Sequence, residues 1–413
     1  MDSPIKPYQI AIPDSAIERL KTKLSLATFP GETTFSNDWK YGAPLDEIRR
    51  LAKVWLEKYD WRQAEAELNR LPQFTTTLSV EGHEEALRIH FIHQKSERPN
   101  SIPLLFCHGS EAGYQGPGSF IEVTKILPLL TSSDKGDEPT FHVVAPSLPN
   151  YGFSQRTSKP GFGIPQCAEV CHKLMLQLGY NKYVTQGGDW GFFVTRAMGI
   201  LYPSHVLASH INFILALAPS LRYSPLLCLE YLMGRYSPAE KAGLQRSRWF
   251  YTEGSGYNQM QRSKPHTLGF ALADSPVALL AWIYEKLRDW TDEYPWTDEE
   301  ILTWISMYLF SEAGADASIR LYYEAFHPAT GAGEGDSALN PLLKWSGIPL
   351  GLSYFPKDVI VLPSSWGRTL GPVVFETRHE EGGHFAAYEK PELVVRDLRK
   401  MFGKGGIDVR LDG

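Results

Sequence analysis

The pattern of apolar and polar positions changes its period along the chain. Over roughly the first 75 residues, apolar positions recur at helical spacing, as in IERLKTKLSLATF and EIRRLAKVWLEKY, and they predict helices. Residues 86–94, ALRIHFIHQ, instead alternate apolar and polar residues and predict a strand. After them, short apolar runs such as IPLLFC and FHVVAP are each followed by a helical pattern. Alternation of this kind is typical of a largely parallel sheet with helices on both faces.

The alternation of strand and helix patterns stops between residues 215 and 343. This segment is helical and rich in Tyr and Trp, and GSGYNQMQRSKP and TGAGEGD interrupt it. The strands IPLGLSYFP and PVVFETR and the helix KPELVVRDLRKMFG then follow. We therefore predict an α/β fold in four parts: a helical N-terminal extension (1–85), the first part of the core (86–214), an inserted helical cap (215–343) and the second part of the core (344–413).

Composition excludes several kinds of partner. The 413 residues carry a net charge of −6 and no long Lys/Arg block, so we expect neither a nucleic acid nor a lipid surface as partner. No apolar run has the length of a membrane span, no signal-like stretch opens the chain, and the four cysteines lack zinc spacing. We expect a cytoplasmic protein. The aromatic content of 12% fits either core packing or a pocket for an apolar ligand.

The stretch VTQGGDWGFF carries the first candidate for chemistry. Apolar residues run into Gly187-Gly188-Asp189-Trp190-Gly191, and a helical pattern follows. Small residues on both sides of a central side chain are typical of a nucleophile elbow, here with Asp189 as the nucleophile. An aspartate that only caps the helix is the alternative.

Two further candidates follow in the chain. Asp358 lies beyond a predicted strand in LSYFPKDVIVLP, and His384 lies in HEEGGHFAAYE, before the last helix. Nucleophile, acid and histidine in this order are typical of the α/β-hydrolase fold, which we predict here. A carboxylate forms a stable ester when it attacks an sp³ carbon, so the candidate substrates are epoxides and alkyl halides. Neither a metal nor an organic cofactor is needed.

Several motifs together resemble those of soluble fungal epoxide hydrolases related to the microsomal enzyme. DWRQAEAELNRLPQFTT looks like the signature of that family's N-terminal domain, and VVAPSLPNYGFS is similar to a family loop, with Asn150 in place of Gly. GGDWG, GHFAA and FPKD are similar to its nucleophile, histidine and acid segments. The resemblance implies hydrolysis of an apolar epoxide to a diol, in detoxification or secondary metabolism, and makes a homodimer an option.

The resemblance also implies two tyrosines in the cap that hydrogen bond the epoxide oxygen. They correspond to Tyr257 in SGYNQMQRSKP and to Tyr322 in IRLYYEAF, with Tyr323 as the alternative to Tyr322. Without the resemblance, any of the 20 tyrosines could be a packing residue.

One loop departs from the family. The family pattern His-Gly-Trp-Pro-Gly-Ser-Phe is kept at His108-Gly109 and in PGSF, but SEAGYQG (110–116) replaces the Trp. The resemblance implies an oxyanion hole built from the N–H of Trp190 and from the loop that begins at His108 and Gly109. We favour a widened loop that still supplies a donor. An epoxide-opening cyclase of secondary metabolism and a catalytically silent binding protein are the alternatives, and haloalkane dehalogenation fits the tyrosines less well.

Overall fold

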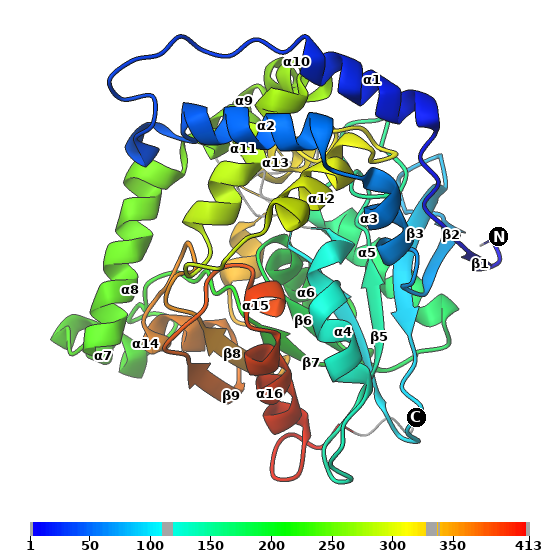
Figure 1. Cartoon of the computed structure of the whole chain (residues 1–413). Helices are drawn as coiled ribbons and strands as arrows, with labels where there is room; N and C mark the ends of the chain where they lie inside the picture. The colour runs from blue at the N-terminus through cyan, green and yellow to red at the C-terminus, as the bar shows by residue number, and fades with distance from the viewer. Residues whose placement is uncertain (1–2, 110–118, 328–336, 338, 410–413) are drawn as a thin grey trace.

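A central sheet organises the computed structural model, which describes residues 3–109, 119–327, 337 and 339–409. Within these residues nine strands form one sheet in the order β1-β2-β3-β5-β4-β6-β7-β8-β9 (Figure 1). The strands are β1 (Lys6–Pro7), β2 (Gln73–Leu78), β3 (Leu87–Gln94), β4 (Ile102–Cys107), β5 (Phe141–Pro146), β6 (Tyr183–Gly187), β7 (Val206–Ile211), β8 (Leu350–Tyr354) and β9 (Val373–Arg378).

Most of the sheet is parallel. Strands β5, β4, β6, β7, β8 and β9 pair in parallel, whereas β1, β2 and β3 pair antiparallel at one edge and β3 joins β5 antiparallel. The inner strands β4, β5 and β6 are almost wholly buried, as expected when helices cover both faces, whereas β9 at the edge is only partly buried. The predicted alternation of strands and helices is confirmed.

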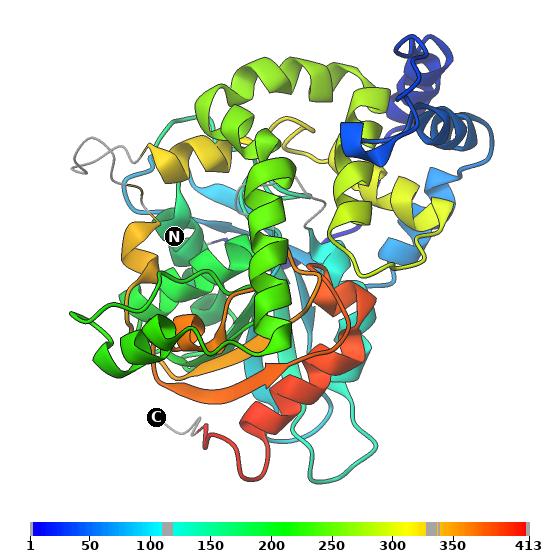
Figure 2. The ribbon, with the colours of Figure 1, turned by 90° about the vertical axis from the view of Figure 1, so that its left-hand side faces the viewer.

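Two pairs of helices cover the sheet. Helix α4 (Val123–Thr131) packs against α16 (Pro391–Phe402), and α5 (Ile164–Gln177) packs against α6 (Trp190–Leu201). The view along the sheet shows the red α16 on one side of the strands and the green α6 on the other (Figure 2). Helices α4, α5 and α16 each bury an apolar face, whereas α6 is buried on all sides from Trp190 to Gly199, so the sheet and the helices share a single core.

The segment between β7 and β8 is helical, as predicted. It contains α7 (Pro225–Met233), α8 (Pro238–Trp249), a π-helical turn (Phe250–Gly254), α9 (Gly256–Ser263), α10 (Pro265–Asp274), α11 (Pro276–Asp289), α12 (Asp298–Leu309) and α13 (Arg320–Phe326). The Gly-rich stretch TGAGEGD at 330–336 lies outside the described residues. The boundaries proposed for the four parts of the chain stay predictions.

The N-terminal extension is not wholly helical, which corrects the sequence-based expectation. It contains α1 (Asp14–Ser25), α2 (Leu45–Glu57) and α3 (Trp61–Leu68), but β1 and β2 also lie in it. Strand β2 reads QFTTTL, and its β-branched threonines pair with β3 from Gln73 opposite Ile92 to Leu78 opposite Leu87. Helix α2 packs on α11 and α12, so the extension covers the cap as well as extending the sheet (Figure 1).

The remaining short elements are η1 (Trp39–Tyr41), η2 (Phe120–Glu122), η4 (Asn340–Leu343), α14 (Ser364–Gly367), η5 (Arg368–Leu370) and α15 (Ala386–Glu389). In the described part of the chain, no single helix is long and apolar enough to cross a membrane. Helices α10 and α11 pass that test only as a pair, with a bend of 112° between them. All four cysteines are free and buried.

Asn150 shows why the family glycine can be replaced in the loop after β5. Its backbone has a φ of 76°, in the left-handed region that asparagine tolerates better than most residues. Its Oδ1 accepts hydrogen bonds from the backbone N–H of Thr157 at 2.8 Å and from the Thr157 hydroxyl at 3.1 Å. The asparagine side chain therefore adds contacts that a glycine lacks.

Candidate active site

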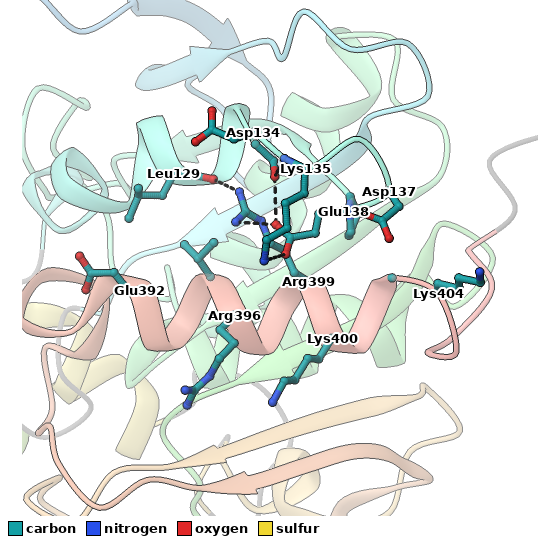
Figure 3. A pocket seen from close by; sticks show the side chains of 14 residues that line it. Leu129, Asp134, Lys135, Asp137, Glu138, Glu392, Arg396, Arg399, Lys400 and Lys404 are labelled. Carbon is teal, nitrogen blue, oxygen red and sulfur yellow. Dashed lines mark hydrogen bonds and ion pairs between the residues drawn. The ribbon is translucent and has the colours of Figure 1, made fainter.

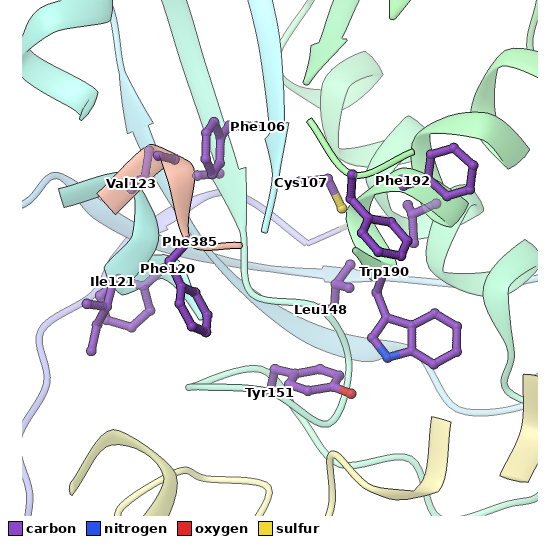
Figure 4. Close-up of a cluster of buried hydrophobic side chains, with 14 of the residues drawn as sticks. Phe106, Cys107, Phe120, Ile121, Val123, Leu148, Tyr151, Trp190, Phe192 and Phe385 are labelled. Carbon is purple, nitrogen blue, oxygen red and sulfur yellow. The ribbon is translucent and has the colours of Figure 1, made fainter. Parts of the chain in front are cut away.

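Asp189 lies at the sharp turn between β6 and α6. Its backbone has a φ of 54° and a ψ of −120°, an unfavourable conformation for a residue with a side chain. Trp190 and Phe192 of α6 belong to one buried apolar cluster with Phe106 and Cys107 of β4 (Figure 4). This packing holds the strained turn, as expected for a nucleophile elbow.

The glycines of the elbow are required by close contacts. A Cβ on Gly187 would lie 2.4 Å from the carbonyl oxygen of Gly191, and a Cβ on Gly191 would lie 2.1 Å from the carbonyl oxygen of Cys107. A Cβ on Gly188 would lie 2.9 Å from Oδ1 of Asn212. The turn therefore requires glycine at 187 and 191, where the contacts are with backbone, whereas a side chain at 188 would displace Asn212. The two backbone contacts bring the start of α6 against the end of β4.

The other two members of the predicted triad are in contact. Nδ1 of His384 donates a hydrogen bond to Oδ1 of Asp358 at 2.5 Å, and the backbone N–H of Val359 donates to the same oxygen at 2.7 Å. In the neutral imidazole this leaves Nε2 as the basic nitrogen. His384 and Asp189 line the same small cavity, so the structure brings together all three residues.

The turn that carries His384 is fixed by Glu389. One carboxyl oxygen of Glu389 accepts the backbone N–H of Gly383 at 2.9 Å, and the other accepts the backbone N–H of Asp292 at 2.9 Å. The N–H of His384 donates to the carbonyl oxygen of Trp290 at 2.8 Å. Burial raises the pKa of Glu389 to about 7. The histidine turn of the core is thus bonded directly to the cap.

The carboxyl group of Asp189 is almost fully buried, with 1% of the residue exposed. Burial raises its pKa well above the usual range, and the negative charges of Glu122 and Asp358 add to the effect. The nearby backbone N–H of Trp190 opposes this shift, as does the position at the start of α6. An ionised Asp189 is therefore poorly solvated, which favours nucleophilic attack.

Tyr322 and Tyr323 are placed differently. Tyr322 is 1% exposed, and its ring meets that of Trp190 edge to face, with centroids 5.3 Å apart. Tyr323 is 41% exposed and stacks on His327 with centroids 4.2 Å apart. Of the two candidates, only Tyr322 therefore lies next to the elbow.

Tyr257 lies in a cap helix that packs against the helix of Tyr322. It lies at the start of α9, directly after the π-helical turn, and helices α9 and α13 pack together. Its ring centroid lies 5.9 Å from that of Trp290, which lies 5.5 Å from that of His384. The buried ammonium of Lys286 lies 5.2 Å from the ring centroid of Tyr257. The same ammonium lies 4.4 Å from the ring centroid of Trp282 and pairs with Glu285 at 2.8 Å, and no sequence pattern indicated these contacts.

The oxyanion-hole role predicted for the loop at His108 and Gly109 stays a prediction. In His108, Nδ1 donates to the carbonyl oxygen of Gly109 at 2.8 Å and Nε2 accepts the N–H of Leu148 at 3.2 Å, while burial lowers its pKa to about 4. The N–H of Gly109 hydrogen bonds the carboxyl of Glu122. Gly109 also lies against Asp189, since a Cβ on it would be 3.1 Å from the Cβ of Asp189. The widened loop at 110–116 lies outside the described residues.

A second concave region lies far from these residues. A groove of about 630 Å³ runs between α16 and the chain after α4, and charges of both signs line it (Figure 3). Within it, Arg399 pairs with Glu138 at 3.0 Å and donates to the carbonyl oxygen of Leu129 at 2.8 Å. None of the residues predicted for the active site lines this groove, and its charged walls do not suit an apolar epoxide.

Comparison with known proteins agrees with this geometry. The family model described as the epoxide hydrolase N terminus matches residues 5–123, and the model of the alpha/beta hydrolase fold matches residues 102–214. Epoxide hydrolase 1 of Sus scrofa is 34% identical over 97% of this chain and 89% of its own length.

Solved structures extend the likeness to the whole fold. The epoxide hydrolase of Aspergillus niger superimposes with a TM-score of 0.81 at 36% identity, over 96% of this chain and 95% of its own. The juvenile hormone epoxide hydrolase of Bombyx mori superimposes with a TM-score of 0.84 at 28% identity, over 96% and 93% of the two chains. The chain therefore belongs to the epoxide hydrolase family of the α/β-hydrolase fold and is an enzyme that hydrolyses epoxides.

Proposed function

We propose that hydrolysis proceeds in two steps, the first of which forms an ester on Asp189. A carboxylate oxygen of Asp189 attacks one epoxide carbon, and the bond between that carbon and the ring oxygen breaks with its electron pair moving to the oxygen. The hydroxyls of Tyr257 and Tyr322 hydrogen bond the ring oxygen, and one of them gives it a proton. The product of this step is a hydroxyalkyl ester of Asp189.

The second step hydrolyses the ester. Nε2 of His384 takes a proton from water, whose oxygen attacks the carbonyl carbon of the ester, and Asp358 stabilises the charged imidazolium. The N–H of Trp190 stabilises the oxyanion that forms. The ester bond then breaks, and the diol leaves with the proton from His384. Hydrolysis leaves Asp189 as the acid, and the loss of its proton balances the proton that the tyrosine gave in the first step, which restores the starting enzyme. The hydrogen bond of 2.5 Å between His384 and Asp358 supports these roles.

The surroundings of the two tyrosines support an apolar epoxide as substrate. Tyr322 packs on Trp190, and Tyr257 packs on Trp282 and Trp290. Aromatic walls bind apolar groups through burial and ring contacts, whereas the two hydroxyl groups provide polar contacts for the ring oxygen. The observation that carries the proposal is the meeting of Asp189 and His384 at one small cavity, with Asp358 hydrogen bonded to His384.

Intact-mass spectrometry tests the mechanism. The His384→Gln variant is exposed to a panel of aryl and alkyl epoxides, and its mass is measured over time. We expect a gain of one epoxide per chain, because the ester forms and is not hydrolysed. The double variant that also carries Asp189→Asn is the control and should show no gain. An adduct that persists in the double variant would place the nucleophile elsewhere, and no adduct in folded His384→Gln would refute the ester.

A further inference from the structure

Glu122 is a buried carboxyl group next to the nucleophile that the mechanism above leaves without a role. It ends η2, directly before α4, and only 8% of the residue is exposed. The backbone N–H groups of Gly109 and Ser119 hydrogen bond its carboxyl group. Glu122 and Asp189 line the same small cavity, and the charge of Glu122 acts on Asp189. A second carboxyl at this place needs a reason, because like charges in a buried site oppose each other.

Glu122 lines a small cavity together with the reacting residues. The cavity encloses about 10 Å³, roughly the space that one water molecule requires. Gly109, Gln186, Asp189, Asn212 and His384 also line it. The cavity therefore joins the ester position to the general base and has the size of the second reactant, water.

Among the described residues, four buried oxygen atoms around this cavity lack hydrogen-bond donors, and both carboxyl oxygens of Asp189 are two of them. The other two are Oε1 of Glu122 and Oε1 of Gln186. The amide of Gln186 is fixed in orientation, since its Nε2 donates to Oδ1 of Asn212 at 2.6 Å. Buried acceptors are nearly always paired, and in a cavity of this size water is the donor that fits.

We propose that Glu122 positions the hydrolytic water, an inference that rests on the two-step mechanism proposed above. The water donates one hydrogen to Nε2 of His384 and the other to Oε1 of Glu122. This orients a lone pair of the water oxygen toward the carbonyl carbon of the Asp189 ester. His384 takes the first hydrogen as the new C–O bond forms, while Glu122 keeps the second in place and gains no proton.

The order of the two steps suits a carboxyl group in this role. Burial raises the pKa of Glu122 to about 8, and an ionised Asp189 opposes its ionisation. Formation of the ester removes the negative charge of Asp189. The ionised, hydrogen-bond-accepting form of Glu122 is therefore favoured in the step that uses water, and the uncharged form in the step that needs Asp189 as nucleophile.

The Glu122→Gln variant tests the proposal. The amide has the same shape, but the N–H groups of Gly109 and Ser119 require its oxygen, so its NH₂ replaces the acceptor in the cavity. With an epoxide that the wild type turns over, we expect kcat to fall by about 10- to 100-fold, and the rate of ester formation to change less than about threefold. Quenched samples should then show the ester by intact mass at steady state.

Controls separate this role from a structural one. Glu65→Gln makes the same change at a residue that is also 8% exposed but lies in the N-terminal extension, and it should accumulate no ester. Glu122→Asp withdraws the oxygen by one methylene and should accumulate ester like Glu122→Gln, which provides a second test if the amide variant folds poorly.

The outcomes are distinct from those of the test of the mechanism. Hydrolysis of the ester at the wild-type rate in Glu122→Gln would overturn the proposal, as would an equal slowing of ester formation and hydrolysis. In either case an adduct in His384→Gln would leave the two-step mechanism standing. If His384→Gln forms no adduct, the mechanism fails first and the role of Glu122 fails with it.

Discussion

Replacement of Gly191 by alanine should separate the elbow from the strand beside it. A Cβ at this position would lie 2.1 Å from the carbonyl oxygen of Cys107, 3.0 Å from its carbonyl carbon and 3.2 Å from the carbonyl oxygen of His108. All three atoms belong to the backbone at the end of β4, where no rotamer change can relieve the contact. Ordinary contact of a Cβ begins at 3.4 Å, so α6 and β4 must move apart by about 1 Å.

Two magnitudes follow from this displacement. Overpacking of a core costs about 1–3 kcal/mol and sometimes more, and a contact with backbone alone belongs at the upper end, so we expect a loss of about 3 kcal/mol. The same movement shifts Asp189 relative to Gly109 and His384. A misplacement of about 1 Å in an active site can lower the rate about 100-fold, which is the loss of kcat that we expect for Gly191→Ala.

Urea denaturation and initial rates with a turned-over epoxide measure the two losses. Gly136→Ala is the matched control, since a Cβ there has nothing within 4 Å and the residue lies far from the elbow. The control should keep both the free energy of unfolding and kcat. Wild-type stability and wild-type activity in Gly191→Ala would show that the elbow tolerates a side chain and would refute the steric argument.

The remaining predictions concern the cap and the response to pH. Tyr257→Phe and Tyr322→Phe should each slow ester formation in single-turnover experiments, whereas Tyr323→Phe, on the exposed neighbour, should leave it unchanged. Lys286→Met should slow the same step, because its buried ammonium, which also pairs with Glu285, lies over the ring of Tyr257 and favours negative charge on that side chain. An unchanged rate would contradict this. Burial lowers the pKa of His90 from 6.5 to about 3 in the folded protein. As the pH falls below about 6.5, the unfolded chain therefore binds a proton that the folded protein does not bind, and the folded state loses stability. Between about pH 7 and about pH 5 this residue should cost about 2 kcal/mol of stability. His90→Gln should therefore lose less stability over that range in urea denaturation, and an equal loss would refute the assignment.

The elbow could be predicted because its information is local. Five consecutive residues around Asp189 combine glycines, a nucleophile and a helical pattern, and the structure shows why glycine is needed at 187 and 191. Asp358 and His384 were found by chain order, since each follows a strand of a parallel sheet whose carboxyl ends meet at one edge. Their roles stay predictions, but their proximity follows from topology.

Glu122 and Lys286 could not be found in this way. In the sequence, Glu122 is an acidic residue in the first turn of a helix, which is an ordinary position. Lys286 is one charge among several on a helix that is otherwise apolar. The roles proposed for them depend on contacts with residues distant in the chain. Glu122 lies near Gly109 and Asp189, and Lys286 lies against the ring of Tyr257. Whether a charged side chain is buried depends on the fold, so a local sequence pattern cannot predict it.

The cap and the core do not act independently in ring opening and ester hydrolysis. Trp290 of the cap accepts the backbone N–H of His384 at 2.8 Å, and its ring lies against the rings of both His384 and Tyr257. Glu389 bonds the N–H groups on both sides of this junction, at Gly383 in the core and at Asp292 in the cap. The proposed acid for ring opening and the proposed base for ester hydrolysis therefore share one support. Since that support is bonded at several points, a rigid shift of the cap would displace the base together with the acid, so the geometry of one step cannot change independently of the other.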